Sequence, residues 1–269
     1  MANLSGSCHA GSGEMKAGSS RLEVTALTGM PMVHPGDDLA RLIVEALAVS
    51  GLALQSGDVL VVAQKIVSKS ENRYLELCAV RPSARAAELA ELTGKDERLV
   101  EVILSESREV VRWRKDVLIV EHRLGFVLAN AGVDASNVGE DGRVLLLPED
   151  PDASCEALRA ALLEKTGVDV GVVINDSWGR AWRLGTVGTA LGVSGIAALL
   201  DLRGVPDLFG RKLQSTEVAV ADELAAAASL IMGQAGEGYP VVLARGFPYA
   251  PRDGRGTELI RPRPLDLFR

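Results

Sequence analysis

The chain has 269 residues and a formal net charge of −7 at pH 7; 47% of its residues are hydrophobic and 4% are aromatic. This length allows a sizeable core in one large or two small domains, and the negative charge argues against non-specific binding to nucleic acid or an anionic membrane. No apolar run reaches the roughly 18 residues of a transmembrane helix, and the three widely spaced cysteines (Cys8, Cys78, Cys155) form neither a metal motif nor a disulfide framework, so we expect a reducing cytoplasm.

The first part of the chain alternates between strand and helix patterns. Residues 1–20 are rich in Gly, Ser and Ala, and we expect them to form a disordered extension. Residues 22–28 alternate like a strand, and Asp38 offers an N-cap to a run with apolar residues at helical spacing. The β-branched run VLVVAQKIVS at 59–68 predicts one buried strand.

The remaining residues continue this interleaving. The patterns predict two helices within 82–106, strands at 117–120 and 125–130, a helix at 153–166, a strand at 170–174, an Ala-rich helix at 217–231 and a last strand at 241–246. We therefore predict a mixed α/β (α+β) fold with one domain over residues 21–247 and a Pro/Arg-rich tail over 248–269.

Common nucleotide-binding signatures are missing from the sequence, because neither a GxxxxGK[ST] loop nor a GxGxxG turn after a strand is present. A glycine-rich stretch occupies 184–195, but its glycines fit helix packing or a turn at least as well as contact with phosphate.

Two acidic turns are more informative. Asp134 and Asn137 follow the strand at 125–130, and Asp176 and Ser177 follow the strand at 170–174. Such groups can hold Mg²⁺ or Mn²⁺ and leave room for phosphate oxygens. For either aspartate alone, capping a turn is the more common role. Both together, with two arginines shortly after the second turn, favour a metal–phosphate site.

A basic series begins inside the predicted strand at 59–68, with Lys65, Lys69 and Arg73 spaced by four residues. On a strand, the two lysines would point to the same side. Burial of a lysine requires an anion to meet it, whereas lysines that protect an edge strand are equally common. Both interpretations remain open at this point.

Five segments in this order resemble the coenzyme F420-0:L-glutamate ligase family. They are LTGMPMVHPGDD, GDVLVVAQKIVSKSENR, GFVLANAGVDASN, INDSWGRAWRLGTVGTALGVSG and DLFGRKLQSTEVAVADELAAAA, and the resemblance runs from about residue 22 to residue 247. Each segment alone is a weak signal, but five in the same order are specific.

The resemblance implies a GTP-dependent reaction in a family-specific α/β fold that forms a homodimer. GTP phosphorylates the terminal carboxylate of F420-0, and the amine of L-glutamate then displaces phosphate to form an amide; further glutamates follow through γ-linkages. The implied cofactors are Mg²⁺ or Mn²⁺, with two ions expected, and a monovalent cation such as K⁺. Cations are needed because two unit charges 4 Å apart repel by roughly 4 kcal/mol at an effective dielectric constant of 20.

The resemblance also implies roles for individual residues. The implied nucleotide contacts are Met30, Pro31, Met32, Val33, Gln64, Lys69 and Asn137. The implied metal ligands are Asp134, Asp176, Ser177 and Glu217, and the implied catalytic residues are Asp134, Asp176 and Lys69. Two rival functions are a metal-dependent phosphohydrolase, in which the carboxylates would activate water, and a non-catalytic GTP-binding subunit of a deazaflavin enzyme.

Overall fold

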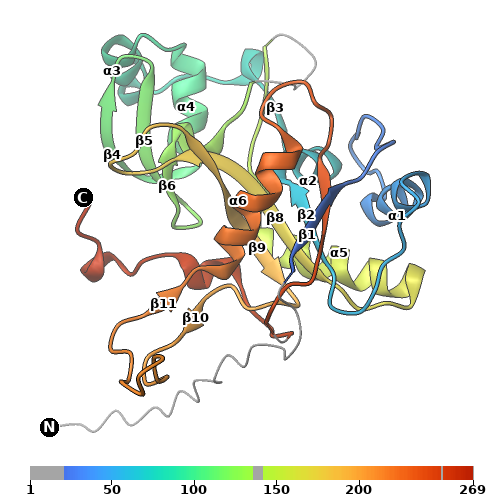
Figure 1. Ribbon diagram of the computed structural model, residues 1–269. Helices are drawn as coiled ribbons and strands as arrows, with labels where there is room; N and C mark the ends of the chain where they lie inside the picture. Colours follow the sequence, from blue (N-terminus) through green and yellow to red (C-terminus); the bar gives the residue numbers. More distant parts are fainter. Residues whose placement is uncertain (1–20, 136–141, 250, 269) are drawn as a thin grey trace, which may run out of the picture.

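The computed structural model describes residues 21–135, 142–249 and 251–268. Its centre is a five-stranded sheet in the order β1 (Glu23–Ala26), β12 (Val241–Arg245), β2 (Val59–Ala63), β8 (Gly171–Gly179) and β9 (Thr186–Ser194) (Figure 1). Strands β2 and β8 are parallel, and the other neighbouring pairs are antiparallel. The predicted mixed α/β class is confirmed.

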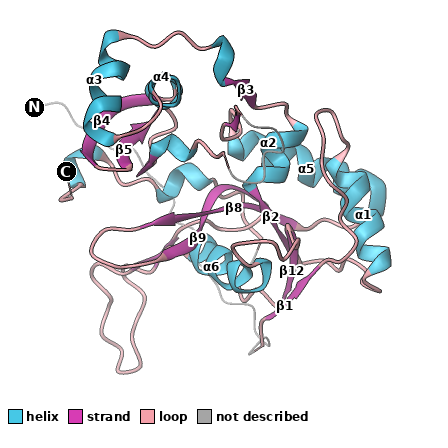
Figure 2. Cartoon of the chain, turned by 90° about the horizontal axis from the view of Figure 1, so that it is seen from above, coloured by secondary structure: helices cyan, strands magenta, loops and turns pink. Residues whose placement is uncertain are grey.

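Helices cover both faces of this sheet. Helices α1 (Leu39–Val49) and α5 (Pro151–Thr166) pack on one face, and α6 (Val220–Met232) packs on the other (Figure 2). In β2, Leu60 and Val62 belong to the first core, while Val59 and Val61 belong to the second. Because successive side chains of a strand point to opposite faces, a strand covered on both sides is a continuous apolar run.

A second lobe has a core of its own. Helices α3 (Ala84–Thr93) and α4 (Glu97–Ser105) pack against a three-stranded sheet of β4 (Ser107–Arg114), β5 (Val117–His122) and β6 (Val127–Ala129). Strands β3 (Tyr74–Glu76) and β7 (Arg143–Leu145) pair beside it. The short 3₁₀ helices are η1 (Leu77–Ala79), η2 (Asn130–Gly132), η3 (Gly256–Leu259) and η4 (Arg263–Leu265).

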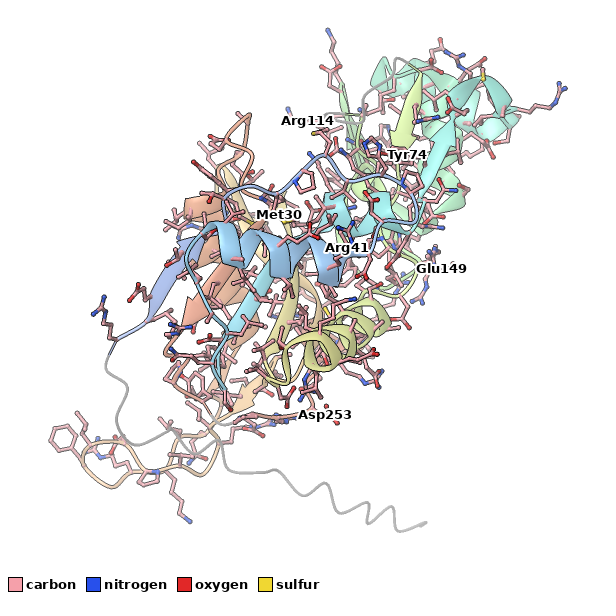
Figure 3. The ribbon with its side chains drawn as sticks, turned by 90° about the vertical axis from the view of Figure 1, so that its right-hand side faces the viewer. Met30, Arg41, Tyr74, Arg114, Glu149 and Asp253 are labelled. Carbon is pink, nitrogen blue, oxygen red and sulfur yellow. The ribbon has the colours of Figure 1, made fainter. Side chains whose placement is uncertain are left out.

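A two-stranded arm lies at the opposite end of the molecule from this lobe (Figure 3). It consists of β10 (Leu200–Asp201) and β11 (Glu217–Val218), with an exposed loop between them. The helix predicted to begin at Glu217 therefore begins at Val220, because residues 217 and 218 pair with β10 instead.

The predicted strand at 59–68 is wrong in its second half. Strand β2 ends at Ala63, and helix α2 (Gln64–Ser70) follows at once. A short, continuously apolar run is compatible with a buried strand or a buried helix, so its periodicity could not locate the change. Lys65 and Lys69 still share one side, but they do so because residues four apart are neighbours on a helix.

The residues after 248 are not the separate tail that the composition indicated. Asp152, buried at the start of α5, accepts hydrogen bonds from the backbone N–H groups of Val193 (2.9 Å) and Gly256 (2.7 Å). Gly254 and Gly256 lie so close to the backbone around β9 that a Cβ would clash with it. This segment therefore joins the main core, whereas the extension expected at 1–20 lies outside the described residues.

Across the described part of the chain, no helix has both the length and the hydropathy needed to cross a bilayer.

Candidate active site

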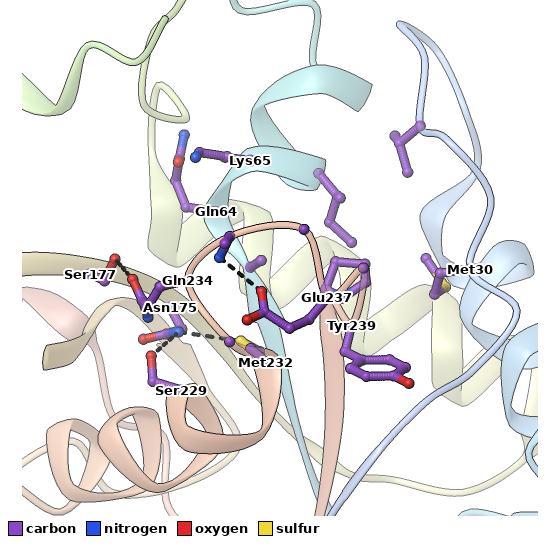
Figure 4. Close-up of a pocket in the computed structure, with 18 of the residues that line it drawn as sticks. Met30, Gln64, Lys65, Asn175, Ser177, Ser229, Met232, Gln234, Glu237 and Tyr239 are labelled. Carbon is purple, nitrogen blue, oxygen red and sulfur yellow. Dashed lines mark hydrogen bonds between the residues drawn. The ribbon is translucent and has the colours of Figure 1, made fainter. Parts of the chain in front are cut away.

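A pocket of about 390 Å³ opens where β2 ends beside its parallel neighbour β8. Its lining comes from four separate parts of the chain: residues 30–33, residues 63–69, residues 175–177, and the end of α6 with the loop that follows it to Pro240 (Figure 4). A pocket of ~300–1,000 Å³ at such a position is typical of small-molecule sites in α/β proteins.

Strand β8 supplies three polar residues to this pocket, and it does not end before them as predicted. The strand continues to Gly179, with an irregularity in its pairing to β9 between Ile174 and Asn175. Asn175 Nδ2 donates to Ser229 Oγ of α6 at 3.3 Å, and its Oδ1 is buried with no partner among the described residues. Ser177 Oγ donates to Gln234 Oε1 at 2.7 Å.

Asp134 reaches the site from the second lobe. Its backbone is held in both directions by Leu145, through N–H to carbonyl hydrogen bonds of 2.9 and 2.8 Å. Its side-chain Oδ2 lies 2.6 Å from Nζ of Lys65, in the first turn of α2. The structure thus brings the carboxylate that follows β6 to the helix that follows β2.

The electrostatics of the site indicate a deficit of positive charge at Asp176. Burial raises the pKa of Asp176 to about 6; the neighbouring Asp134 adds to this effect, and the Ser177 backbone N–H and Lys65 oppose it. Burial also lowers the pKa of Lys69, and the charge of Lys65 lowers it further, against the opposing effect of Asp134. A further cation beside the two carboxylates would therefore stabilise their ionised forms.

Most of the predicted nucleotide contacts lie together. Met30, Pro31, Met32 and Val33 form one wall of the pocket, while Gln64 and Lys69 lie on α2 beside Lys65. Gln64 is buried and held by hydrogen bonds from its Nε2 to Ser68 Oγ (2.6 Å) and to the Leu146 carbonyl (3.4 Å). Asn137, the remaining predicted contact, lies outside the described residues.

Glu217 is not brought to this site within one chain. It lies on β11, with a half-exposed side chain 3.4 Å from Nη2 of Arg203. It precedes α6, whereas Met232 at the far end of α6 lines the pocket. A helix of 13 residues is about 20 Å long at 1.5 Å per residue. Within one chain, Glu217 therefore lies at the other end of α6 from the part of the pocket that Met232 lines, and its assignment as a ligand of a second metal ion stays a prediction.

The loop at 233–238 was missed by the sequence analysis. It follows α6 with the sequence GQAGEG, and Gly233 and Gly238 both adopt positive φ angles. The loop is shaped by Glu237, whose Oε2 accepts a hydrogen bond from the Ala235 N–H at 2.8 Å. Three glycines between an Ala-rich helix and the last strand were the feature of the sequence that could have indicated this loop.

The glycine-rich stretch at 184–195 has a different role from phosphate contact. Gly188 and Gly192 lie inside β9, where a Cβ on Gly188 would meet the Ala225 carbonyl of α6 and one on Gly192 would meet the Pro151 carbonyl of α5. These glycines allow a helix to approach each face of the strand closely. Helix packing, one of the two interpretations left open, therefore explains them.

The described residues supply a partial donor set for a divalent ion. They contain no group of three or more His, Cys, Asp or Glu side chains arranged for a metal. Asp134, Asp176 and Ser177 are hard oxygen donors, and Mg²⁺ in phosphate-binding sites is commonly held by one or two carboxylates together with substrate phosphates and water. The residues fit such an ion on the condition that a phosphate completes its coordination.

Comparison with known proteins adds an independent line of evidence. Residues 29–246 match the model of the F420-0:Gamma-glutamyl ligase family. A coenzyme F420:L-glutamate ligase of Methanothermobacter thermautotrophicus is 50% identical over 92% of this chain and 99% of its own. Enzymes of that name are also 50% identical in Methanopyrus kandleri, over 88% of this chain and 93% of their own, and 45% identical in Archaeoglobus fulgidus, over 93% and 97%.

Proposed function

The chain belongs to the F420-0:Gamma-glutamyl ligase family, a family of ligases, and on that premise we propose that it joins L-glutamate to coenzyme F420-0 through an amide bond. The observation that carries the proposal is the pocket at the end of β2, beside β8. It gathers Met30–Val33, Gln64, Lys69, Asp176 and Ser177, and Lys65 links it to Asp134.

The reaction proposed for this pocket has two steps. A carboxylate oxygen of F420-0 attacks the γ-phosphorus of GTP, the bond to the β,γ-bridging oxygen breaks, and GDP leaves. The amine of glutamate then attacks the carbonyl carbon of the acyl phosphate, loses a proton and expels inorganic phosphate. Further glutamates would be joined to the γ-carboxylate of the last residue by the same two steps.

The roles proposed for the residues follow from their positions. Asp134, Asp176 and Ser177 would hold Mg²⁺ or Mn²⁺, which supplies positive charge to the transferring phosphoryl group. Lys69, already desolvated, would contact the phosphates. The backbone N–H groups of the loop at 233–238 offer further phosphate contacts, as glycine-rich loops commonly do.

Gln234 is the oxygen donor that we propose in place of Glu217 within one chain, because its Oε1 is already 2.7 Å from Ser177 Oγ. We also propose that the enzyme uses two metal ions and a monovalent cation such as K⁺, and that it forms a homodimer. In that case Glu217 would act as a metal ligand only in the site of a second copy of the chain. An analytical ultracentrifugation run would test that state directly.

One experiment tests the proposed function. The purified protein is incubated with F420-0, GTP, Mn²⁺ and L-glutamate, and product masses are measured. We expect one or more glutamate additions, with GTP turnover that depends on glutamate. A phosphohydrolase would instead consume GTP at the same rate without glutamate, and a non-catalytic subunit would bind GTP without consuming it.

A further inference from the structure

Lys65 makes the contact on which this inference depends. Its Nζ lies 2.6 Å from Oδ2 of Asp134, and both side chains are mostly buried, with 32% and 25% of their surface exposed. Lys65 also lines the pocket, and Lys69 is one helical turn further along α2. Lys65 therefore connects a proposed metal ligand to the pocket proposed for the nucleotide, and Figure 4 shows its side chain among the residues that line this pocket.

The two partners differ in their freedom to move. Asp134 is fixed by its two backbone hydrogen bonds to Leu145, which is completely buried. The Lys65 side chain extends from α2, and a lysine ammonium on a flexible four-carbon stem can change partner without movement of the helix. If this contact breaks, the lysine side chain is therefore the part that moves.

A divalent cation on Oδ2 of Asp134 would compete with this contact. An ammonium hydrogen-bonded to Oδ2 occupies a position that a metal ion would take on the same oxygen. If the ammonium and the metal ion both touched Oδ2, the repulsion between their single and double positive charges would exceed the stability that a partly exposed ion pair contributes. A metal ion that binds Oδ2 therefore displaces Lys65 from this oxygen, and the pocket that Lys65 lines is the adjacent space that would contain anionic oxygens.

We propose that Lys65 holds the cation position on Asp134 until a divalent ion binds, and that its ammonium then turns to the phosphate group in the pocket. The inference rests on the proposed function, since it needs both a metal and a phosphate anion. The consequence is that the binding affinities of the metal and the nucleotide are coupled. A metal ion that binds alone must displace Lys65 from Asp134, whereas a bound nucleotide offers Lys65 a new partner. By linkage, each ligand should then increase the affinity for the other.

The alternative is that Lys65 and Asp134 form an ion pair that only stabilises the fold. A matched control is the pair of Lys165 with Asp38, which are 2.9 Å apart, with 35% and 46% of their side chains exposed. Lys165→Met removes the same charge as Lys65→Met while leaving the site intact. Lys65→Arg keeps the charge at the site.

The test measures Mn²⁺ binding in the absence of nucleotide, from the electron paramagnetic resonance signal of free Mn²⁺. We expect Lys65→Met to bind Mn²⁺ roughly five- to tenfold more tightly than wild type, the equivalent of losing one partly buried ion pair. Lys165→Met should match wild type, and Lys65→Arg should bind no more tightly than wild type. An Mn²⁺ affinity of Lys65→Met equal to or weaker than that of Lys165→Met would overturn the inference.

A second titration measures the coupling itself. Adding GDP should tighten Mn²⁺ binding in wild type, and this enhancement should be smaller in Lys65→Met; an equal enhancement would count against the partner exchange. Asp134→Asn separates this inference from the proposed function. If Asp134→Asn and wild type bind Mn²⁺ alike, the metal assignment itself is wrong, whereas loss in Asp134→Asn with no change in Lys65→Met removes only the role of Lys65.

Discussion

Ala63, the last residue of β2, is the register partner of Asn175 in the parallel strand β8. Beyond this pair the two strands separate. The chain turns from β2 into α2, whereas β8 continues with Asp176 and Ser177. The lysines of α2 and the polar side chains of β8 therefore line one pocket, beside which the second lobe places Asp134.

Asp134→Asn and Asp176→Asn should each lower ligase turnover by about 100-fold or more, because a hard cation needs the charge that the amide lacks. The folded state should persist. In the presence of EDTA, Asp176→Asn should be at least as stable as wild type at pH 7.5, because it removes a carboxylate whose ionisation burial opposes. Thermal melting and turnover at limiting Mn²⁺ check both points.

The control for these two variants is Asp253→Asn, an aspartate whose side chain is 99% exposed. It should retain wild-type turnover. Near-normal turnover of Asp134→Asn and Asp176→Asn at limiting Mn²⁺ would exclude them as metal ligands.

Lys69→Met should raise the KM for GTP by roughly tenfold and change the KM for glutamate much less, since one charge-assisted phosphate contact is worth about 1.5 kcal/mol. Lys69 is only 7% exposed, and methionine keeps most of its apolar stem, so the fold should tolerate the change. Steady-state kinetics with each substrate varied in turn measure the effect. A larger rise for glutamate than for GTP would reassign Lys69 to the amino-acid subsite.

The sequence predicted the order of the elements well and the geometry of the site less well. Asp38 caps α1 by accepting from the Arg41 N–H, as its position before a helical pattern indicated. The end of β2 was missed because tertiary packing decides whether a short apolar run is a strand or a helix. Glu217 was assigned by motif position, and only the fold shows that α6 separates it from the pocket.

The glycines illustrate the same limit. The sequence alone cannot separate a glycine that allows close packing from one that lines a ligand site, because both need the absence of Cβ. Gly192 belongs to the first kind. Gly233 lines the pocket, but its positive φ angle and its closeness to the Glu237 side chain also require the absence of Cβ.

Gly192→Ala should destabilise the protein by about 2 kcal/mol, because the new methyl group would meet the rigid backbone of α5 at Pro151. The matched control is Gly179→Ala at the end of the neighbouring strand β8, where a Cβ would meet nothing within 4 Å. Its stability should stay within about 0.5 kcal/mol of wild type. Urea unfolding of both variants measures the difference, and equal stabilities would show that β9 and α5 can separate without penalty.

Glu106 should make the protein sensitive to acid. Its Oε2 lies 3.4 Å from His122 Nε2, 3.0 Å from Arg123 Nε and 3.4 Å from Arg73 Nη2. The contact with His122, followed by those with the two arginines, outweighs burial and holds the pKa of Glu106 at about 2. Because this pKa is depressed in the folded state, the stability it provides is present above about pH 4.5 and is lost as pH falls toward 2.

Glu106→Gln should therefore cost about 2 kcal/mol at pH 7, allowing for partial screening by solvent. Its stability should also fall less steeply than that of wild type between pH 5 and pH 3. Urea unfolding at several pH values gives both quantities. Parallel pH profiles for the two proteins would assign the acid sensitivity to other carboxylates.

The activation of the carboxylate gives the sharpest test of the reaction. A carboxylate does not react with an amine in water at neutral pH, so it must first acquire a leaving group. An enzyme thioester would need a reactive thiol, but Cys155 is completely buried and burial raises the pKa of its thiol. Cys78 is exposed in η1, outside the described lining of the pocket, and Cys8 lies outside the described residues.

The remaining routes are an acyl nucleotide, which releases pyrophosphate, and an acyl phosphate, which releases GDP. Carboxylates and lysines around one pocket suit transfer of the γ-phosphoryl group. The carboxylates would bind cations and the lysines carry positive charge, so both would stabilise the negative charge of the group during transfer. In the acyl phosphate, one carboxylate oxygen becomes the bridge to phosphorus and departs with it when glutamate attacks the carbonyl carbon. With F420-0 labelled by ¹⁸O in its carboxylate, mass spectrometry should therefore find one labelled oxygen in the released inorganic phosphate. Release of GMP and pyrophosphate, or of unlabelled phosphate, would refute the acyl phosphate even if glutamate were still ligated.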